Sequence, residues 1–114
     1  MKQRHFEKID ALPERSNVLV ESLYSWAEYR ILKKRLGESL VILAIHASPR
    51  TRHARLAVRK KRPLSTAEAE SRDESQLVRF QQGAPIALAD IMVENDRTLE
   101  ELYARLDRVI ENYA

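Results

Sequence analysis

A block of basic residues in the middle of the chain is the segment best suited to chemistry with anions. The interval between Glu38 and Glu68 has no acidic residue, and its cations are Arg50, Arg52, Arg55, Arg59, Lys60, Lys61 and Arg62. On a helix that begins at Pro49, the arginines at positions 52, 55, 59 and 62 fall on one stripe. Such a stripe can face phosphates, nucleic acid or an acidic protein. The alternative is a solvent-exposed helix face, ion-paired with Glu68, Glu70, Asp73 and Glu74.

A second candidate is Glu21, which follows the apolar run Val18-Leu19-Val20. This run predicts a short buried strand over 17–20, so Glu21 is expected at its carboxyl end. Ligands of open α/β sheets bind at that edge. His46 is expected at the same edge of the next strand, and we assign it no chemistry, since a single histidine there is more often structural.

The elements that would position these residues alternate between strands and helices. Apolar runs predict strands over 17–20, 40–45 and 86–93. Serine or threonine caps predict helices after Ser25, Ser48, Ser65 and Thr98, and an amphipathic helix is expected over 2–12. Gly37 is expected to end the helix after Ser25, and the helix after Ser65 is expected to run to about Gln82. The pattern favours an α/β fold with a parallel sheet of about three strands and flanking helices.

Composition agrees with one folded domain over 1–114, within which 60–82 holds few large apolar residues and is expected to be a mobile, lid-like excursion. The chain is 44% hydrophobic and 32% charged, and it contains no cysteine. Its longest apolar run, Leu40 to Ile45, is far too short to span a membrane. The N-terminal residues show no apolar signal core. We therefore expect a soluble, cytoplasmic protein without a membrane partner.

Three stretches resemble adenylate-kinase-related P-loop proteins of the dephospho-CoA-kinase-like kind. They are Leu19-Val20-Glu21-Ser22-Leu23-Tyr24-Ser25, Ala44-Ile45-His46-Ala47-Ser48-Pro49 through Arg62, and Ala89 through Leu102. Their order and spacing cover the chain from about residue 17 to 112. The resemblance implies a partial P-loop kinase-like, three-layer fold and phosphoryl transfer from ATP to a small nucleotide-type acceptor.

The same resemblance implies roles for individual residues. Arg55 and Arg59 match arginines that lead into a closing lid, and Arg72 matches the arginine on its far side. Together with Glu21 they would be the catalytic residues, and Glu21 would also hold Mg²⁺. Arg62, Asn95 and Asp96 would contact the cofactor ATP, with the turn at Asn95 passing near the adenine.

One part of that family pattern is missing from the sequence. A P-loop needs G-x-x-x-x-G-K-[ST] after a buried strand, whereas the only glycines are Gly37 and Gly83. Met1 is therefore expected to begin in the middle of the family domain, as a truncated piece, a fragment of a larger product or a degenerate relative. We expect no turnover of ATP by this chain alone.

The absent central strand also predicts self-association. Strands over 17–21 and 40–45 would be left with unpaired edges, which either pair with each other or are satisfied by a second copy. We favour a homo-oligomer, a dimer or larger, with an interface at Val18, Val20, Val41 and Leu43 or the helices that cover them.

Two other classes of function remain open at this point. The chain is alternatively a non-catalytic interaction or regulatory module with a kinase half-fold, which the lack of glycine-rich loops favours. It is alternatively a basic RNA- or anion-binding protein built on 50–62. The acidic residues of the C-terminal half and the few aromatic residues near the basic block count against nucleic acid.

Overall fold

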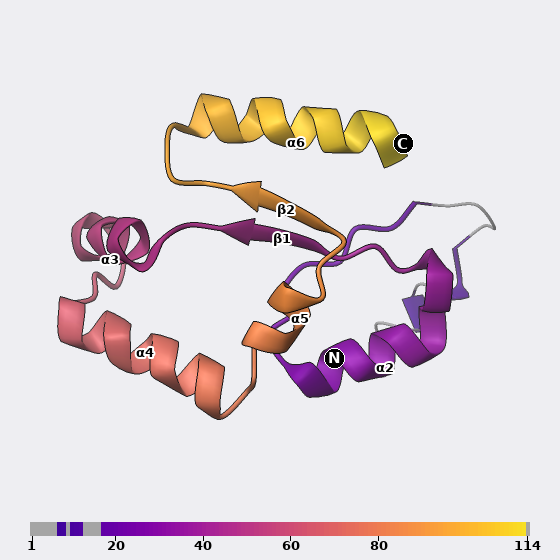
Figure 1. Cartoon of the computed structure of the whole chain (residues 1–114), viewed down its shortest axis with the longest axis horizontal. Coiled ribbons are helices and arrows are strands. Elements are labelled where there is room, and N and C mark those ends of the chain that lie inside the picture. Colours follow the sequence, from indigo (N-terminus) through magenta and orange to yellow (C-terminus); the bar gives the residue numbers. More distant parts are fainter. Residues whose placement is uncertain (1–6, 9, 13–16, 114) are drawn as a thin grey trace.

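The computed structural model describes residues 7, 8, 10–12 and 17–113. Its elements are α2 (Trp26–Leu36), a 3₁₀ turn (Gly37–Ser39), β1 (Leu43–His46), α3 (Pro49–Val58), α4 (Thr66–Val78), α5 (Gly83–Ala87), β2 (Ile91–Glu94) and α6 (Leu99–Tyr113). α6 runs beside β2, on one side of the sheet. The helices on the β1 side are α2, α4 and α5, and α3 follows the carboxyl end of β1 (Figure 1). Most of the helix expected over 2–12 lies outside the described residues. None of the described helices is long and apolar enough to cross a membrane.

The α/β class and the parallel sheet are confirmed. β1 and β2 pair in parallel, with Leu43 opposite Ile91 and His46 opposite Glu94. The Asp90 carboxylate accepts a 2.8 Å hydrogen bond from the Ile42 N–H, and the Ile42 carbonyl accepts from the N–H groups of Asp90 and Ile91. These contacts fix the register where the two strands begin.

The expected number of strands is wrong for the described part of the chain, because the sheet there has two strands. Residues 17–20 form irregular, exposed backbone, and Leu19 is 93% exposed. An apolar run becomes a strand only where a neighbouring strand takes up its backbone groups, and here β1 and β2 pair with each other. The other two strands are shorter than expected, and Ile86 lies in α5 rather than in β2.

Helix starts follow the predicted caps closely. The hydroxyl groups of Ser25, Ser48 and Ser65 accept hydrogen bonds from the third residue beyond them, and the Thr98 hydroxyl accepts from Glu101 N–H. Gly37 ends α2 with φ at 53°, a left-handed conformation that costs glycine little. α4 ends at Val78, short of Gln82, and Gly83 and Pro85 lie in α5 rather than ending α4.

The core is small and made largely of small side chains. Its buried residues are Leu32, Ala44, Ala47, Ala69, Val93 and Leu102, and Pro85 of α5 is also buried. α6 packs on β2, α2 on α5 and α3 on α4. Ala69, only 1% exposed, is buried within α4. The segment 60–82 is therefore not wholly outside the core, and its function as a lid stays a prediction.

Candidate functional site

The basic block does not form one continuous helical stripe. α3 ends at Val58, and Arg59 already has extended backbone. Arg62 has φ at 50°, in the left-handed region. Pro63 also disfavours helical backbone at Arg62, the residue directly before it. The prediction that Arg59 and Arg62 continue the helix was therefore wrong, and both lie on the turn between α3 and α4.

This turn folds back on itself and brings its arginines to α4. The Arg59 Nε donates a 2.6 Å hydrogen bond to the Arg62 carbonyl oxygen. The Leu64 N–H donates to the Leu56 carbonyl oxygen over 3.0 Å, which closes the turn against the last part of α3. As a result, Arg59 and Arg62 of the turn lie opposite α4.

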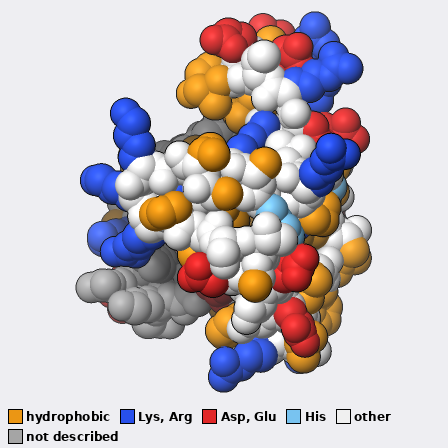
Figure 2. All heavy atoms as spheres, turned by 90° about the vertical axis from the view of Figure 1, so that its left-hand side faces the viewer, with side chains coloured by type: hydrophobic (Ala, Val, Ile, Leu, Met, Phe, Trp, Pro, Cys, Tyr) orange, Lys and Arg blue, Asp and Glu red, His pale blue; other side chains and the backbone are white. Residues whose placement is uncertain are grey.

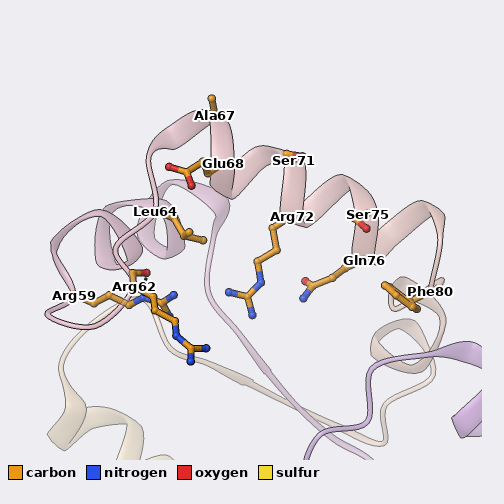
Figure 3. Close-up of a pocket in the computed structure, with 10 residues that line it drawn as sticks. All are labelled: Arg59, Arg62, Leu64, Ala67, Glu68, Ser71, Arg72, Ser75, Gln76 and Phe80. Atoms are coloured by element: carbon orange, nitrogen blue, oxygen red, sulfur yellow. Dashed lines mark hydrogen bonds between the residues drawn. The ribbon is translucent and has the colours of Figure 1, made fainter.

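An open hollow of about 850 Å³ lies between this turn and α4. Its polar side chains include Arg59 and Arg62 from the turn and Ser71, Arg72, Ser75 and Gln76 from α4. Figure 3 shows the Arg72 side chain extending from α4 into the space beside Arg62, with the Gln76 amide next to it. We call this feature the arginine hollow. It brings together three of the seven residues that the sequence singled out.

The charges in the arginine hollow are unbalanced. Its one acidic lining residue, Glu68, accepts a hydrogen bond from the Ser65 N–H over 3.2 Å. Hydrogen bonds from the Ser65 backbone and hydroxyl lower the pKa of Glu68, and they turn its carboxylate toward the start of α4. Within the described residues, the side chains of Arg62 and Arg72 have no ion-pair or hydrogen-bond partner. The hollow therefore presents positive charge to an incoming anion.

Beside the hollow, one carboxylate joins α3 to α4. Asp73 Oδ1 accepts from Arg52 Nη1 over 2.7 Å, and its Oδ2 lies 2.8 Å from His53 Nε2. Burial acts to raise the pKa of Asp73, but the hydrogen bonds from Arg52 and His53 outweigh it and lower that pKa. Arg52 also donates to the Ala47 carbonyl oxygen, so the cluster is anchored to the segment before α3.

Arg55 and Asn95 come together elsewhere. The Arg55 guanidinium donates to the carbonyl oxygens of Asn95 and Arg97, over 2.7 and 3.1 Å. It thus holds the loop between β2 and α6 against α3. Arg55 does not line the arginine hollow, so its predicted contact with a phosphate remains untested.

Asp96 attaches the same loop to the start of α3. Its Oδ1 accepts a 2.9 Å hydrogen bond from the Ser48 N–H at the start of α3. This bond, with a further one from the Thr51 hydroxyl, lowers the pKa of Asp96. A carboxylate is favoured at the N-terminal end of a helix, and here it belongs to the protein itself.

Glu21 is not where the sequence placed it. Residues 17–20, which directly precede it, form no strand, its side chain is exposed, and it does not line the arginine hollow. The described residues contain no group of three or more His, Cys, Asp or Glu side chains that could hold a metal ion. A role of Glu21 with Mg²⁺ stays a prediction.

The sequence did not predict that Arg52 and His53 both contact the Asp73 carboxylate. Arg52 was assigned to a stripe and Asp73 to a set of possible counter-ions, while His53 was not considered. The available signal was the Arg52-His53 pair on one predicted helix and an acid on the next. The pairing spans 20 residues and depends on the turn at 59–64, so no local pattern gives it.

The chain is similar over most of its length to proteins named UPF0200 protein. It is 40% identical over 102 residues to one from Hyperthermus butylicus, covering 88% of this chain and 53% of that protein. It is 39% identical over 83 residues to one from Methanopyrus kandleri, covering 70% and 42%. It is 34% identical over 97 residues to one from Thermococcus sibiricus, covering 82% and 50%. The chain spans about half the length of these curated relatives, and no protein-family model matches it.

Proposed function

We propose that the chain is the lid-bearing half of a nucleotide-kinase-like protein and that it binds the phosphates of a nucleotide in the arginine hollow. The observation that carries the proposal is the meeting of Arg59, Arg62 and Arg72 around one open space. Two of these guanidinium groups have no partner among the described residues, so their charge is available to a ligand.

The chemistry of the lining suits phosphate. Arginine presents a planar set of N–H donors that matches two phosphate oxygens at once. Ser71, Ser75 and Gln76 add neutral donors on the α4 side of the hollow. Phosphoryl transfer depends mainly on positioning and on neutralising charge at the transferring group. These residues would bind and orient phosphates and stabilise their charge.

ATP would supply the transferable phosphoryl group when bound. The three arginines fit its phosphates, whereas the sequence contains no G-x-x-x-x-G-K-[ST] to cradle them. The proposed role of these 114 residues is therefore to bind and orient phosphates.

The arrangement of charge favours this proposal over a nucleic-acid interface. Figure 2 shows the face at the α3 and α4 end, where the Lys and Arg side chains are spread around the margin of the face. A surface that follows a nucleic-acid backbone presents a patch or stripe of cations. On this face, groups of basic side chains at the margins are separated by apolar and acidic side chains, so they form no continuous stripe across it.

Titration of pyrophosphate and ATP into the protein at low salt tests the proposal. Arg62→Gln and Arg72→Gln should each weaken both ligands about tenfold, the value expected for one charge-assisted contact. Arg50→Gln, on the exposed side of α3, is the matched control for net charge and should change little. Adenosine, which has no phosphate, should not compete. Equal losses in all three variants would show general charge attraction and no defined site.

A second candidate function is assembly, favoured by the apolar surface. Large apolar side chains on α6 are more than half exposed, namely Leu99, Tyr103, Ile110 and Tyr113. Val18, Val20 and Val41 of the expected interface are also exposed, while Leu43 is half-buried. Contiguous apolar surface marks interaction sites in soluble proteins. Self-association and phosphate binding do not exclude each other, and either can hold without the other.

A further inference from the structure

The Asp73 side chain connects α4 to α3. Among the described residues, its carboxylate makes the only side-chain hydrogen bonds that join these two helices, to Arg52 and to His53. The His53 and Asp73 side chains are sheltered from solvent, at 15% and 23% exposed, while the Arg52 side chain is 38% exposed. Hydrogen bonds held in this way restrict the rotation of α4 about its own axis more than apolar contacts do, because hydrogen bonds are directional.

The residue before Asp73 is Arg72, which lines the arginine hollow. Successive helix residues project about 100° apart. One side chain can thus bind α3 while its neighbour extends into the hollow. Arg72 and Asp73 also share the recess lined by Arg52, Arg55 and Gln76, so the two functions meet on one turn of α4.

We propose that Asp73 is a positioning residue, whose contacts with Arg52 and His53 fix the rotation of α4 that directs Arg72 into the hollow. The effect on ligand binding rests on the proposed function, whereas the effect on α4 does not. The charged and titratable groups that face Asp73 are Arg52, His53 and Arg55 from α3 and Arg72 from α4. Loss of its carboxylate therefore removes the negative charge that basic groups of both helices share.

The sign of the effect separates positioning from simple electrostatics. Removing a negative charge near a phosphate site normally strengthens anion binding, because it removes a repulsion. Positioning predicts the opposite result for Asp73, since Arg72 would no longer be held toward the hollow. Glu74 is a matched control, as it is the adjacent acid on α4, is exposed and has no partner among the described residues.

The first experiment measures pyrophosphate affinity at low salt. Asp73→Asn should weaken binding roughly threefold to tenfold, corresponding to partial loss of the Arg72 contact. Asp73→Glu, which keeps the carboxylate, should restore most of the affinity. His53→Leu removes one of the two contacts and should give a smaller loss, which provides a second test if Asp73→Asn folds poorly. Glu74→Gln should leave affinity unchanged or slightly increase it.

The second experiment measures α4 without any ligand. The chain contains no cysteine, so spin labels can be placed at Ala54→Cys on α3 and Glu70→Cys on α4. The distance between the labels should have a narrow distribution in the parent protein and a broad one with Asp73→Asn. An unchanged distribution would overturn the proposal, whatever the affinities show. Broadening together with pyrophosphate binding that ignores Arg72→Gln would support positioning and refute the proposed function instead.

Discussion

Replacement of Arg55 should separate stability from phosphate binding. Its guanidinium donates to two carbonyl oxygens of the β2–α6 loop. Arg55→Met removes both hydrogen bonds and the charge while it keeps most of the apolar stem. The loop then loses its attachment to α3 on the Arg55 side, although the bond from Ser48 N–H to Asp96 remains. We expect lower stability and an unchanged affinity for pyrophosphate.

The size of the effect follows from the setting of these bonds. A hydrogen bond to a charged group contributes about 1.5–3 kcal/mol when it is sheltered. Arg55 is exposed, and both carbonyl groups regain water after the substitution, so the discounted total is about 1–2 kcal/mol. For a domain of this size each kcal/mol corresponds to a fall in Tm of roughly 4–6 °C. Arg55→Lys retains the charge and one donor position, and should recover at most half of the loss.

Urea unfolding and thermal melting of these two variants check the reasoning, with Arg50→Met as the control on the same helix. Arg50 is exposed and has no partner among the described residues, so its variant should melt like the parent. Two results would refute the reasoning: an Arg55→Met protein as stable as the parent, or one with the same loss of affinity as Arg72→Gln. The second result would assign Arg55 to the phosphate site, as the kinase resemblance implies.

Two further predictions concern acid and assembly. The pKa of Asp73 is held below its ordinary 3.8, so its contribution to stability is present above that value and is lost as the pH falls through the lowered pKa. The difference in stability between the parent and Asp73→Asn should therefore be present above pH 3.8 and disappear as the pH falls below that value in urea unfolding; a difference that persists in acid would contradict it. Light scattering at micromolar concentration should show a dimer or larger species, because apolar side chains on α6 and at Val18 and Val41 are exposed, and a monodisperse monomer with a cooperative melt would rule that out.

The sequence predicted local structure well because the relevant interactions are local. Each serine or threonine cap satisfies backbone groups within one turn of its own position, and the helices after Ser25, Ser48, Ser65 and Thr98 begin where these caps predict. The α/β class was likewise predictable from the alternation of apolar runs and capped helices. These signals need no knowledge of the distant chain.

Strand prediction failed where it depended on a distant partner. The apolar run over 17–20 has the composition of a strand, but no neighbouring strand takes up its backbone in the described structure. The run Leu40–Ile45 shows the same effect at smaller scale, since β1 covers only the residues opposite β2. Apolar composition therefore marks candidates, and pairing decides which residues become strand.

The candidate site shows how the end of a helix changes the meaning of a charge pattern. If the basic block were one helix, Arg55, Arg59 and Arg62 would lie on one face and all three would meet the same ligand. α3 ends at Val58, and the block then divides between two tasks. Arg55 holds a loop by its carbonyl groups, while Arg59 and Arg62 face Arg72 across the hollow.

The same division occurs on α4 between two adjacent residues. Arg72 and Asp73 are neighbours of opposite charge, and by sequence alone they are candidates for one ion pair or one ligand. The structure separates them, because the Asp73 carboxylate already has partners in Arg52 and His53. Adjacent helix residues project about 100° apart, so Asp73 contacts α3 while Arg72 lines the hollow. The contact between His53 and Asp73 spans 20 residues of the sequence, which is why the composition of the segment could not indicate it.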